Sequence, residues 1–368
     1  MAGLFRASSG SLAAALDLAA HPVSGRQTRR IPALSAVRLT AEGDGLSITS
    51  TAVDDTVTTR LDGTAEGEVA VPLDMLAALM RHFPAAEEVV IAADHRAAAI
   101  AAGNSSFRLP VFPITDLPEP LVLGPETGCV ELDAGVARDL FARPAFAAAD
   151  DASCPYLNGI LLHNVDDQLV AVATDGFRFC RVTTPAASTL SADHSLIIPN
   201  EMERAINRLL GSTSGRVMLR RSANLFAADG SGFVVVSRTI GSTYPDHERW
   251  IPIKATNVVT TNCVGVREAL ARFKAVADPQ IRPHEVSLRW NAAGLQLRAD
   301  GGEDRLAAGV EGEGETAAQI HYLDVAIGAV RGANVRISVA DSGGMILVTD
   351  PDDEGFVAGL MPIRPRSS

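Results

Sequence analysis

A few polar residues in this chain are of the types that acid–base or nucleophilic catalysis uses. Asp150, Asp151, Asp175 and His163 could act as acids or bases, and Asp341–Gly344 reads Asp-Ser-Gly-Gly, a turn that could carry a nucleophile. None of them lies in a recognised catalytic spacing. The sequence has no G-x-S-x-G, H-E-x-x-H, Walker A or dinucleotide-binding motif. We therefore expect no catalytic residues and no enzyme.

The cysteines indicate neither a metal site nor disulfide bonds. Cys129, Cys154, Cys180 and Cys263 are far apart, and no C-x-x-C pair occurs. Reduced thiols, most of them buried, are the expected state of these four cysteines. The sequence predicts no metal and no cofactor.

The overall charge argues against a nucleic-acid partner unless the basic residues are segregated. The formal net charge is −12, whereas non-specific DNA binding depends on Lys and Arg at the phosphates. A DNA-binding role therefore requires the basic residues to be segregated from the acidic ones. The N-terminus is not typical of a signal peptide, and no run of 18 apolar residues predicts a membrane span. A cytoplasmic protein is expected.

Internal repetition is the most informative feature of the sequence. Three hairpin patterns, at 36–49, 159–172 and 286–298, alternate apolar and polar residues around a polar turn. Their spacing is the size of a domain. Each hairpin lies between two helix-like segments and is followed by two further strands. The six predicted helices are 11–20, 72–83, 134–149, 199–210, 266–277 and 322–330.

Four short strings within these repeats resemble one known family. They are Tyr156–Ile160 (YLNGI), Val172–Phe179 (VATDGFRF), Tyr244–Trp250 (YPDHERW) and Leu360–Arg364 (LMPIR). In this order they are similar to motifs of the bacterial DNA polymerase III beta subunit, the DNA sliding clamp, over essentially the whole chain. Phe177, Phe179 and Trp250 depart from the family pattern, and so does the tail that begins at Pro365.

The resemblance implies an α+β fold of three tandem clamp domains, each with two helices packed on antiparallel sheets. The expected domains are 1–126, 127–251 and 252–368. Members of the family form a head-to-tail dimeric ring whose helices line the hole. Such a protein is a non-catalytic processivity factor that acts with DNA polymerase III.

The resemblance also implies a cleft between the second and third domains for short linear peptides of polymerase subunits and of the clamp loader. Apolar anchors with few polar groups suit such a site. Carried over by motif, the cleft consists of Leu157, Thr174, Gly176, Phe177, Arg178, Phe179, Pro245, Trp250, Met361, Pro362, Ile363 and Arg364.

A ring of this kind encloses double-stranded DNA without reading its sequence. Windows over the six helices sum to a charge of +1, so the rest of the chain carries −13. The helices are thus far less acidic than the remainder. The residues expected to contact DNA are Arg26, Arg81, Arg138, Tyr156, Arg204, Arg208, Arg272 and Lys274.

The resemblance places Phe107 and Leu109 at the subunit interface, facing Ala275 and Val276 of a second copy. Ala275 is smaller than the usual aliphatic residue, which would reduce the buried apolar area. This difference and the altered C-terminus leave an alternative open. The alternative is a divergent clamp paralogue with impaired ring closure or altered partner binding.

Overall fold

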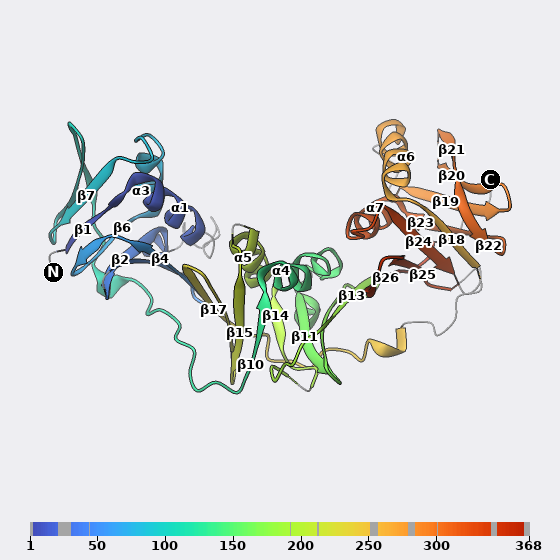
Figure 1. The fold of residues 1–368 in the computed structure, drawn as a ribbon, viewed down its shortest axis with the longest axis horizontal. Helices are drawn as coiled ribbons and strands as arrows, with labels where there is room; N and C mark the ends of the chain where they lie inside the picture. Colours follow the sequence, from blue (N-terminus) through green and yellow to red (C-terminus); the bar gives the residue numbers. More distant parts are fainter. Residues whose placement is uncertain are drawn as a thin grey trace. The chain divides into compact units, whose positions relative to one another are not determined.

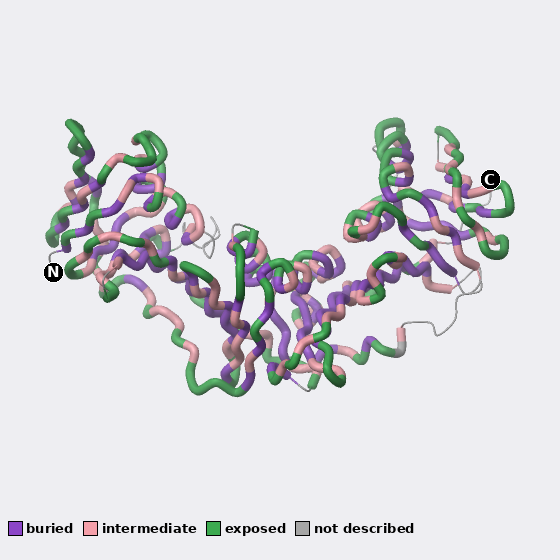
Figure 2. Tube along the Cα trace, viewed as in Figure 1, coloured by how far each residue is buried: buried purple, intermediate pink, exposed green. Residues whose placement is uncertain are grey.

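The computed structural model describes residues 3–20, 31–43, 45–191, 193–211, 213–250, 257–278, 284–299, 301–339 and 344–363. No helix among them is long and apolar enough to cross a membrane. The chain forms two compact units. Unit 1 contains residues 1–138, 188–190 and 201–239, and unit 2 contains the rest. Figure 1 shows the elements of both, and Figure 2 shows that buried residues follow the strands while the hairpin turns are exposed.

The larger sheet of unit 1 combines strands from the first and second repeats. All of its strands are antiparallel, and its two halves meet at the pair β4–β17, where Val57 lies opposite Val235. Its order is β10 (Gly128–Asp133), β15 (Arg216–Ser222), β16 (Leu225–Gly230), β17 (Phe233–Arg238), β4 (Asp55–Asp62), β3 (Gly45–Thr51), β2 (Ala36–Glu42) and β6 (Glu68–Pro72).

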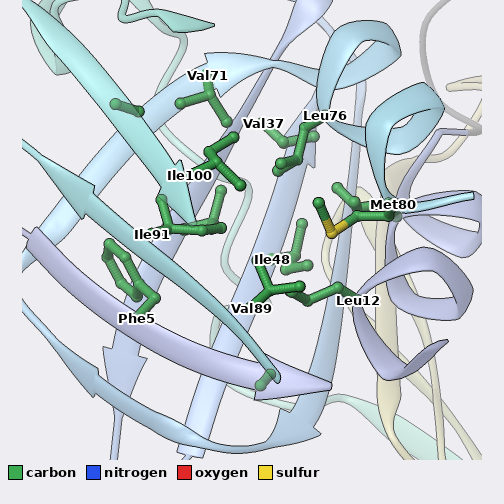
Figure 3. Packing of buried hydrophobic residues seen from close by; sticks show 14 of the residues in the cluster. Phe5, Leu12, Val37, Ile48, Val71, Leu76, Met80, Val89, Ile91 and Ile100 are labelled. Carbon is green, nitrogen blue, oxygen red and sulfur yellow. The ribbon is translucent and has the colours of Figure 1, made fainter. Parts of the chain in front are cut away.

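The smaller sheet of unit 1 covers the other side of one hydrophobic core. Its order is β5 (Thr64–Glu66), β1 (Gly3–Ser8), β7 (Glu88–Ala93), β8 (Ala97–Ala102) and β9 (Ser105–Pro110). The core collects side chains from both sheets and from the helices of the first repeat, including Phe5, Leu12, Ile48 and Met80 (Figure 3). β9 has a partner on one side only among the described strands.

The larger sheet of unit 2 repeats this architecture with strands of the second and third repeats. Its halves meet at the pair β13–β26, where Cys180 lies opposite Ala358. Its order is β14 (Ile197–Pro199), β11 (Gly159–Val165), β12 (Gln168–Thr174), β13 (Arg178–Pro185), β26 (Asp353–Leu360), β25 (Ile346–Asp350), β24 (Asn334–Val339), β18 (Asn257–Asn262) and β22 (Ala308–Glu311).

The smaller sheet of unit 2 belongs to the third repeat alone. Its order is β21 (Gly302–Leu306), β20 (Gly294–Ala299), β19 (Glu285–Asn291) and β23 (Gly314–Gln319). All three predicted hairpins therefore form, as β2–β3, β11–β12 and β19–β20. Their alternation places one face of each strand in a core, which fixes the register.

Six α-helices occur within the described residues, one near each predicted position. They are α1 (Ser9–Ala19), α3 (Leu73–Met80), α4 (Ala134–Ala142), α5 (Asn200–Gly211), α6 (Cys263–Val276) and α7 (Ile320–Gly328). α1 packs on α3, and α6 packs on α7 (Figure 1). Side-chain caps begin two of them: Ser11 N donates to Ser8 Oγ and Gly265 N to Asn262 Oδ1, each at 3.1 Å.

Three helix predictions were wrong in detail. The helix predicted over 134–149 ends at Ala142, because Pro144 cannot continue it, and a short 3-10 turn (η3, Ala145–Ala147) follows. The prolines expected to open helices, Pro72 and Pro199, are instead the last residues of β6 and β14. The acidic stretch 309–314 divides between β22 and β23 at Gly312, which has a φ of +80°.

Candidate functional site

The turn between β12 and β13 presents an aromatic side chain to solvent. Asp175 holds the turn: its Oδ1 accepts from the backbone N–H groups of Phe177 and Arg178 at 2.9 and 3.0 Å. Gly176 has a φ of +88°, a conformation that glycine adopts without strain. Phe177 is consequently 63% exposed. Asp175, considered above as a possible acid or base, therefore has a structural role in this turn.

The end of β26 lies directly beside this turn. Met361 N donates to Phe177 O at 2.8 Å, and Ile363 N donates to Ala317 O at 2.8 Å. Met361 is 48% exposed, while Pro362 and Ile363 are half-buried. The backbone bonds bring Met361 next to Phe177 on one surface of unit 2. Arg364 lies outside the described residues.

Phe179 and Trp250 pack together next to this surface. Their ring centroids are 6.2 Å apart, and Phe179 is only 1% exposed. A side chain at Gly359 would overlap the Phe179 ring and the Met345 sulfur, so this close packing needs glycine there. Phe179 therefore acts as a buried support, and the half-buried Trp250 covers it.

The remaining apolar residues of the predicted cleft are joined through Tyr244. Leu157 packs in a cluster with Tyr244, and Thr174 N donates to the Tyr244 hydroxyl at 2.9 Å. Burial raises the pKa of Tyr244 above its usual value, so the hydroxyl stays protonated. Pro245 follows and is half-buried.

Arg178 is held in place and is not a freely moving cation. Its Nε donates to Asp175 Oδ2 at 2.9 Å, and its guanidinium lies 4.4 Å from the Tyr322 ring centroid and 5.8 Å from that of Phe146. Such stacking and pairing suits the flat guanidinium. Sequence reasoning missed Tyr322, Phe146 and Met345 as supports of this surface. The signal that could have identified the first two is that each is an aromatic residue within a predicted helix.

The basic residues predicted to face DNA fall into two groups. One group forms ion pairs: Arg272 with Asp304 at 2.6 Å, Lys274 with Asp324 at 2.5 Å, and Arg81 with Asp17. These pairs are at least partly exposed, and pairs of this kind contribute only about 0–1 kcal/mol.

The other group consists of Arg138, Arg204 and Arg208, which are all exposed. Within the described residues, no carboxylate forms an ion pair with any of these three. Arg204 and Arg208 lie one turn apart on α5. Tyr156, also predicted at the DNA, is half-buried in η4 (Pro155–Leu157), and its hydroxyl lies 4.0 Å from Cys154 Sγ. Arg26 lies outside the described residues.

The residues predicted at a subunit interface differ in exposure. Phe107, on β9, is 44% exposed and packs edge-on against Phe83 with 6.1 Å between ring centroids. Leu109 points into the core of unit 1 and is 7% exposed. Ala275 and Val276 end α6 and are exposed. Phe107 and Val276 thus present apolar side chains to solvent, whereas the Leu109 side chain is buried within unit 1.

Models of one protein family match most of the chain. The DNA polymerase III beta subunit N-terminal domain matches residues 4–121, and its central domain matches residues 131–246. A beta sliding clamp of Pseudomonas putida is 29% identical over 360 residues, covering 95% of this chain and 96% of that protein. A beta sliding clamp of Caulobacter vibrioides is 28% identical over 350 residues, covering 91% and 93%.

Solved structures agree with the sequence relatives. The sliding clamp of Pseudomonas aeruginosa, crystallised with griselimycin, has a TM-score of 0.88 and 26% identity, and covers 99% of this chain and 100% of that one. The sliding clamp of Caulobacter crescentus has a TM-score of 0.87 and 25% identity, covering 98% and 100%.

Proposed function

Because this chain belongs to the DNA polymerase III beta subunit family, the DNA sliding clamps, we propose that two copies close head-to-tail into a ring around duplex DNA. The observation that carries the proposal is the repeated strand pairing. β4–β17 joins the first and second repeats, and β13–β26 joins the second and third. The equivalent strands of the outer repeats, β9 and β21, each have a neighbour on one side only within the described sheets.

The register of the three repeats can be aligned from their internal pairs. Leu39–Ile48, Leu162–Ala171 and Leu288–Leu297 are equivalent pairs of the three hairpins. The next strand paired with each hairpin is β4 in the first repeat, β13 in the second and β21 in the third, so these three strands are equivalent. In the same way, Ile91–Ile100, Leu219–Ala228 and Ile337–Val348 make β9 the equivalent of β17 and β26. The missing third pair is therefore β9 of one copy with β21 of the other.

This alignment predicts a specific register between the two copies. Val57 pairs with Val235, and Cys180 pairs with Ala358, and all four are completely buried. The equivalent positions in the third pair are Phe107 and Gly302. The Phe107 ring would thus lie opposite a glycine. Because glycine has no side chain, the ring would have space to pack against the partner's sheet and become buried.

A head-to-tail contact produces a closed ring only when the rotations sum to a full turn. Two copies with three domains each give six equivalent positions. We assign the domains to 1–126, 127–251 and 252–368, because the pairs β4–β17 and β13–β26 then lie at the domain boundaries. Pairing would also remove the open edges of β9 and β21.

DNA contact in such a ring depends on a few basic residues. Arg138, Arg204 and Arg208 are exposed and, within the described residues, without a carboxylate partner, so they are the first candidates for phosphate contact. Arg81, Arg272 and Lys274 would exchange weak ion pairs for phosphates. Phosphate contacts carry no sequence information, and this suits a protein that slides.

The surface formed by Phe177, Trp250, Met361, Pro362 and Ile363 is our proposed docking site for partner peptides. It combines exposed apolar side chains with a buried aromatic support at Phe179. Anchoring by aromatic residues in such surfaces dominates peptide affinity. Polymerase III subunits and the clamp loader would bind here through short linear segments. The protein itself is a non-catalytic processivity factor, and we place it in the cytoplasm with the replicated DNA.

The test is light scattering followed by retention on DNA. We expect a mass of twice the 38.5 kDa chain and, after loading by a clamp loader, retention on circular DNA with loss from linearised DNA. Equal retention on both DNAs would refute encirclement. A monomeric mass at all concentrations would refute the β9–β21 contact and favour the paralogue with impaired ring closure.

A further inference from the structure

Three histidines that are far apart in sequence converge inside unit 2. His163 lies on β11, His194 precedes β14, and His247 precedes the 3-10 turn η5 (Glu248–Trp250). Their ring centroids are 4.8 Å apart for His163 and His194, 5.0 Å for His163 and His247, and 5.6 Å for His194 and His247. One ring nitrogen from each lies within 4.8 Å of the others.

Two of these ring nitrogens are buried and lack a hydrogen-bond partner within the part of the chain that the structure describes. His163 and His247 are 2% and 1% exposed. Their Nε2 and Nδ1 atoms, respectively, are buried and have no hydrogen-bond partner among the described residues. A buried polar atom without a partner costs about 1–3 kcal/mol. An ion that accepts electron pairs from these nitrogens would remove that cost.

We propose that His163, His194 and His247 bind one divalent transition-metal ion of the first row, with Zn²⁺ as the best match. Imidazole nitrogen is a ligand for Zn, Cu, Ni and Fe, whereas Ca²⁺ and Mg²⁺ need oxygen. Three protein nitrogens with one water complete a tetrahedral Zn²⁺ site. Metal-binding imidazoles must be neutral, and the burial of His163 and His247 favours the neutral form.

The geometry requires a small contraction on binding. Zn–N bonds of about 2.0–2.1 Å at tetrahedral angles place neighbouring nitrogens roughly 3.3 Å apart. The present separations reach 4.8 Å. His194 is the half-exposed member and lies in a loop, so it is the ring with room to move. Its exposed side also provides a path for the ion.

Charges around the cluster are mixed. Arg181 on β13 opposes a cation, because its charge acts on both His163 and His247. Two carboxylates act in the other direction: Asp246 on His247, and Glu248 on Arg181. The local field therefore does not exclude a divalent ion.

Such an ion would have a structural role. It would join β11 to the segment 244–250. This segment starts with a bond from Tyr244 N to His194 O at 2.8 Å and ends in a turn in which Trp250 N donates to His247 O at 3.1 Å. The inference rests on the histidine cluster and does not depend on the proposed function.

The experiment is a titration of the metal-free full-length protein with Zn²⁺ in competition with a chromogenic chelator, repeated with Co²⁺. We expect one ion per chain and the visible absorption of tetrahedral Co²⁺. His194→Ala removes the half-exposed ligand and should weaken Zn²⁺ binding at least about tenfold. His163→Phe keeps a ring in the core and should have the same effect. His82→Ala changes an exposed histidine of unit 1 and is the matched control.

A second readout separates a true site from surface binding. Hydrogen exchange of residues 244–250 should slow with Zn²⁺ in the wild type and in His82→Ala, but not in His194→Ala. The proposal is overturned if the wild type binds no Zn²⁺, or if His194→Ala binds it as tightly as the wild type does. Slowed exchange in His194→Ala would also overturn it.

Discussion

Removing the Phe107 side chain tests the contact that closes the proposed ring. Phe107 is 44% exposed in the single chain, and pairing of β9 with β21 would cover it. An aromatic side chain has roughly 200 Å² of surface, so about 90 Å² is available for burial. At about 25 cal/mol per Å², each contact would lose about 2 kcal/mol in Phe107→Ala.

A head-to-tail dimer contains this contact twice. The dimer would therefore lose about 4 kcal/mol, which corresponds to a dissociation constant roughly a thousandfold higher. Sedimentation velocity across a dilution series measures this constant directly. Circular dichroism of the variant should show an intact fold, since more than a third of the side chain is exposed in the single chain.

The matched control is Val122→Ala. Val122 is 78% exposed and lies outside the strands of unit 1, so its truncation removes exposed apolar surface that belongs to neither β9 nor β21. We expect its dimer constant to equal that of the wild type. The reasoning fails if Phe107→Ala changes the constant by less than about threefold while the chain stays folded, or if both variants weaken the dimer alike.

Three further perturbations address DNA, peptides and pH. Replacing Arg204 and Arg208 together by Ala should reduce the slope of log affinity for duplex DNA against log salt concentration by about 2, as measured by fluorescence anisotropy. An unchanged slope would contradict their role, and so would the same reduction in an Arg60→Ala control. Trp250→Ala should weaken a fluorescent partner peptide at least about tenfold, and unchanged affinity in a folded variant would exclude Trp250 as an anchor. Burial raises the pKa of Glu203 to about 7. The contribution of this carboxyl group to the free energy of unfolding is therefore full below its unfolded pKa and is lost as the pH rises through 7. In Glu203→Gln, the free energy of unfolding measured by chemical denaturation should vary less between pH 5 and 8, and at pH 8 it should be up to about 3 kcal/mol higher than in the wild type. An unaltered dependence on pH would contradict this.

The elements were predictable because local patterns determine them. The alternation in 36–49, 159–172 and 286–298 places one face of each hairpin in a core, and the structure has all three. Helix positions followed from apolar spacing, but their ends did not. The helix that begins at Ala134 shows why. Phe146 and Ala147 continue the apolar spacing, but the helix ends before Pro144, which cannot continue the helical hydrogen bonds.

The site residues were harder to interpret from sequence, because their partners are distant. Nothing near Arg272 in the chain shows that Asp304, 32 residues away, pairs with it. The same holds for His163, His194 and His247, which have no metal-binding spacing and meet only through the sheet and two loops. Sequence patterns predict which residues share a strand or helix face, but long-range packing decides which charges stay free.

The proposed pair of β9 with β21 would differ in one physical respect from the two pairs within the chain, and this difference accounts for the side chain at Phe107. In the pairs β4–β17 and β13–β26 one continuous chain holds both strands, so their effective concentration is high and small residues such as Cys180 and Ala358 suffice. The pair between two copies must also offset the loss of translational and rotational freedom, which costs several kcal/mol or more. A large apolar anchor is therefore needed at that position alone. In the proposed register, Phe107 opposite Gly302 would meet this requirement, and the contact between copies would then depend on one side chain that the other two pairs do without.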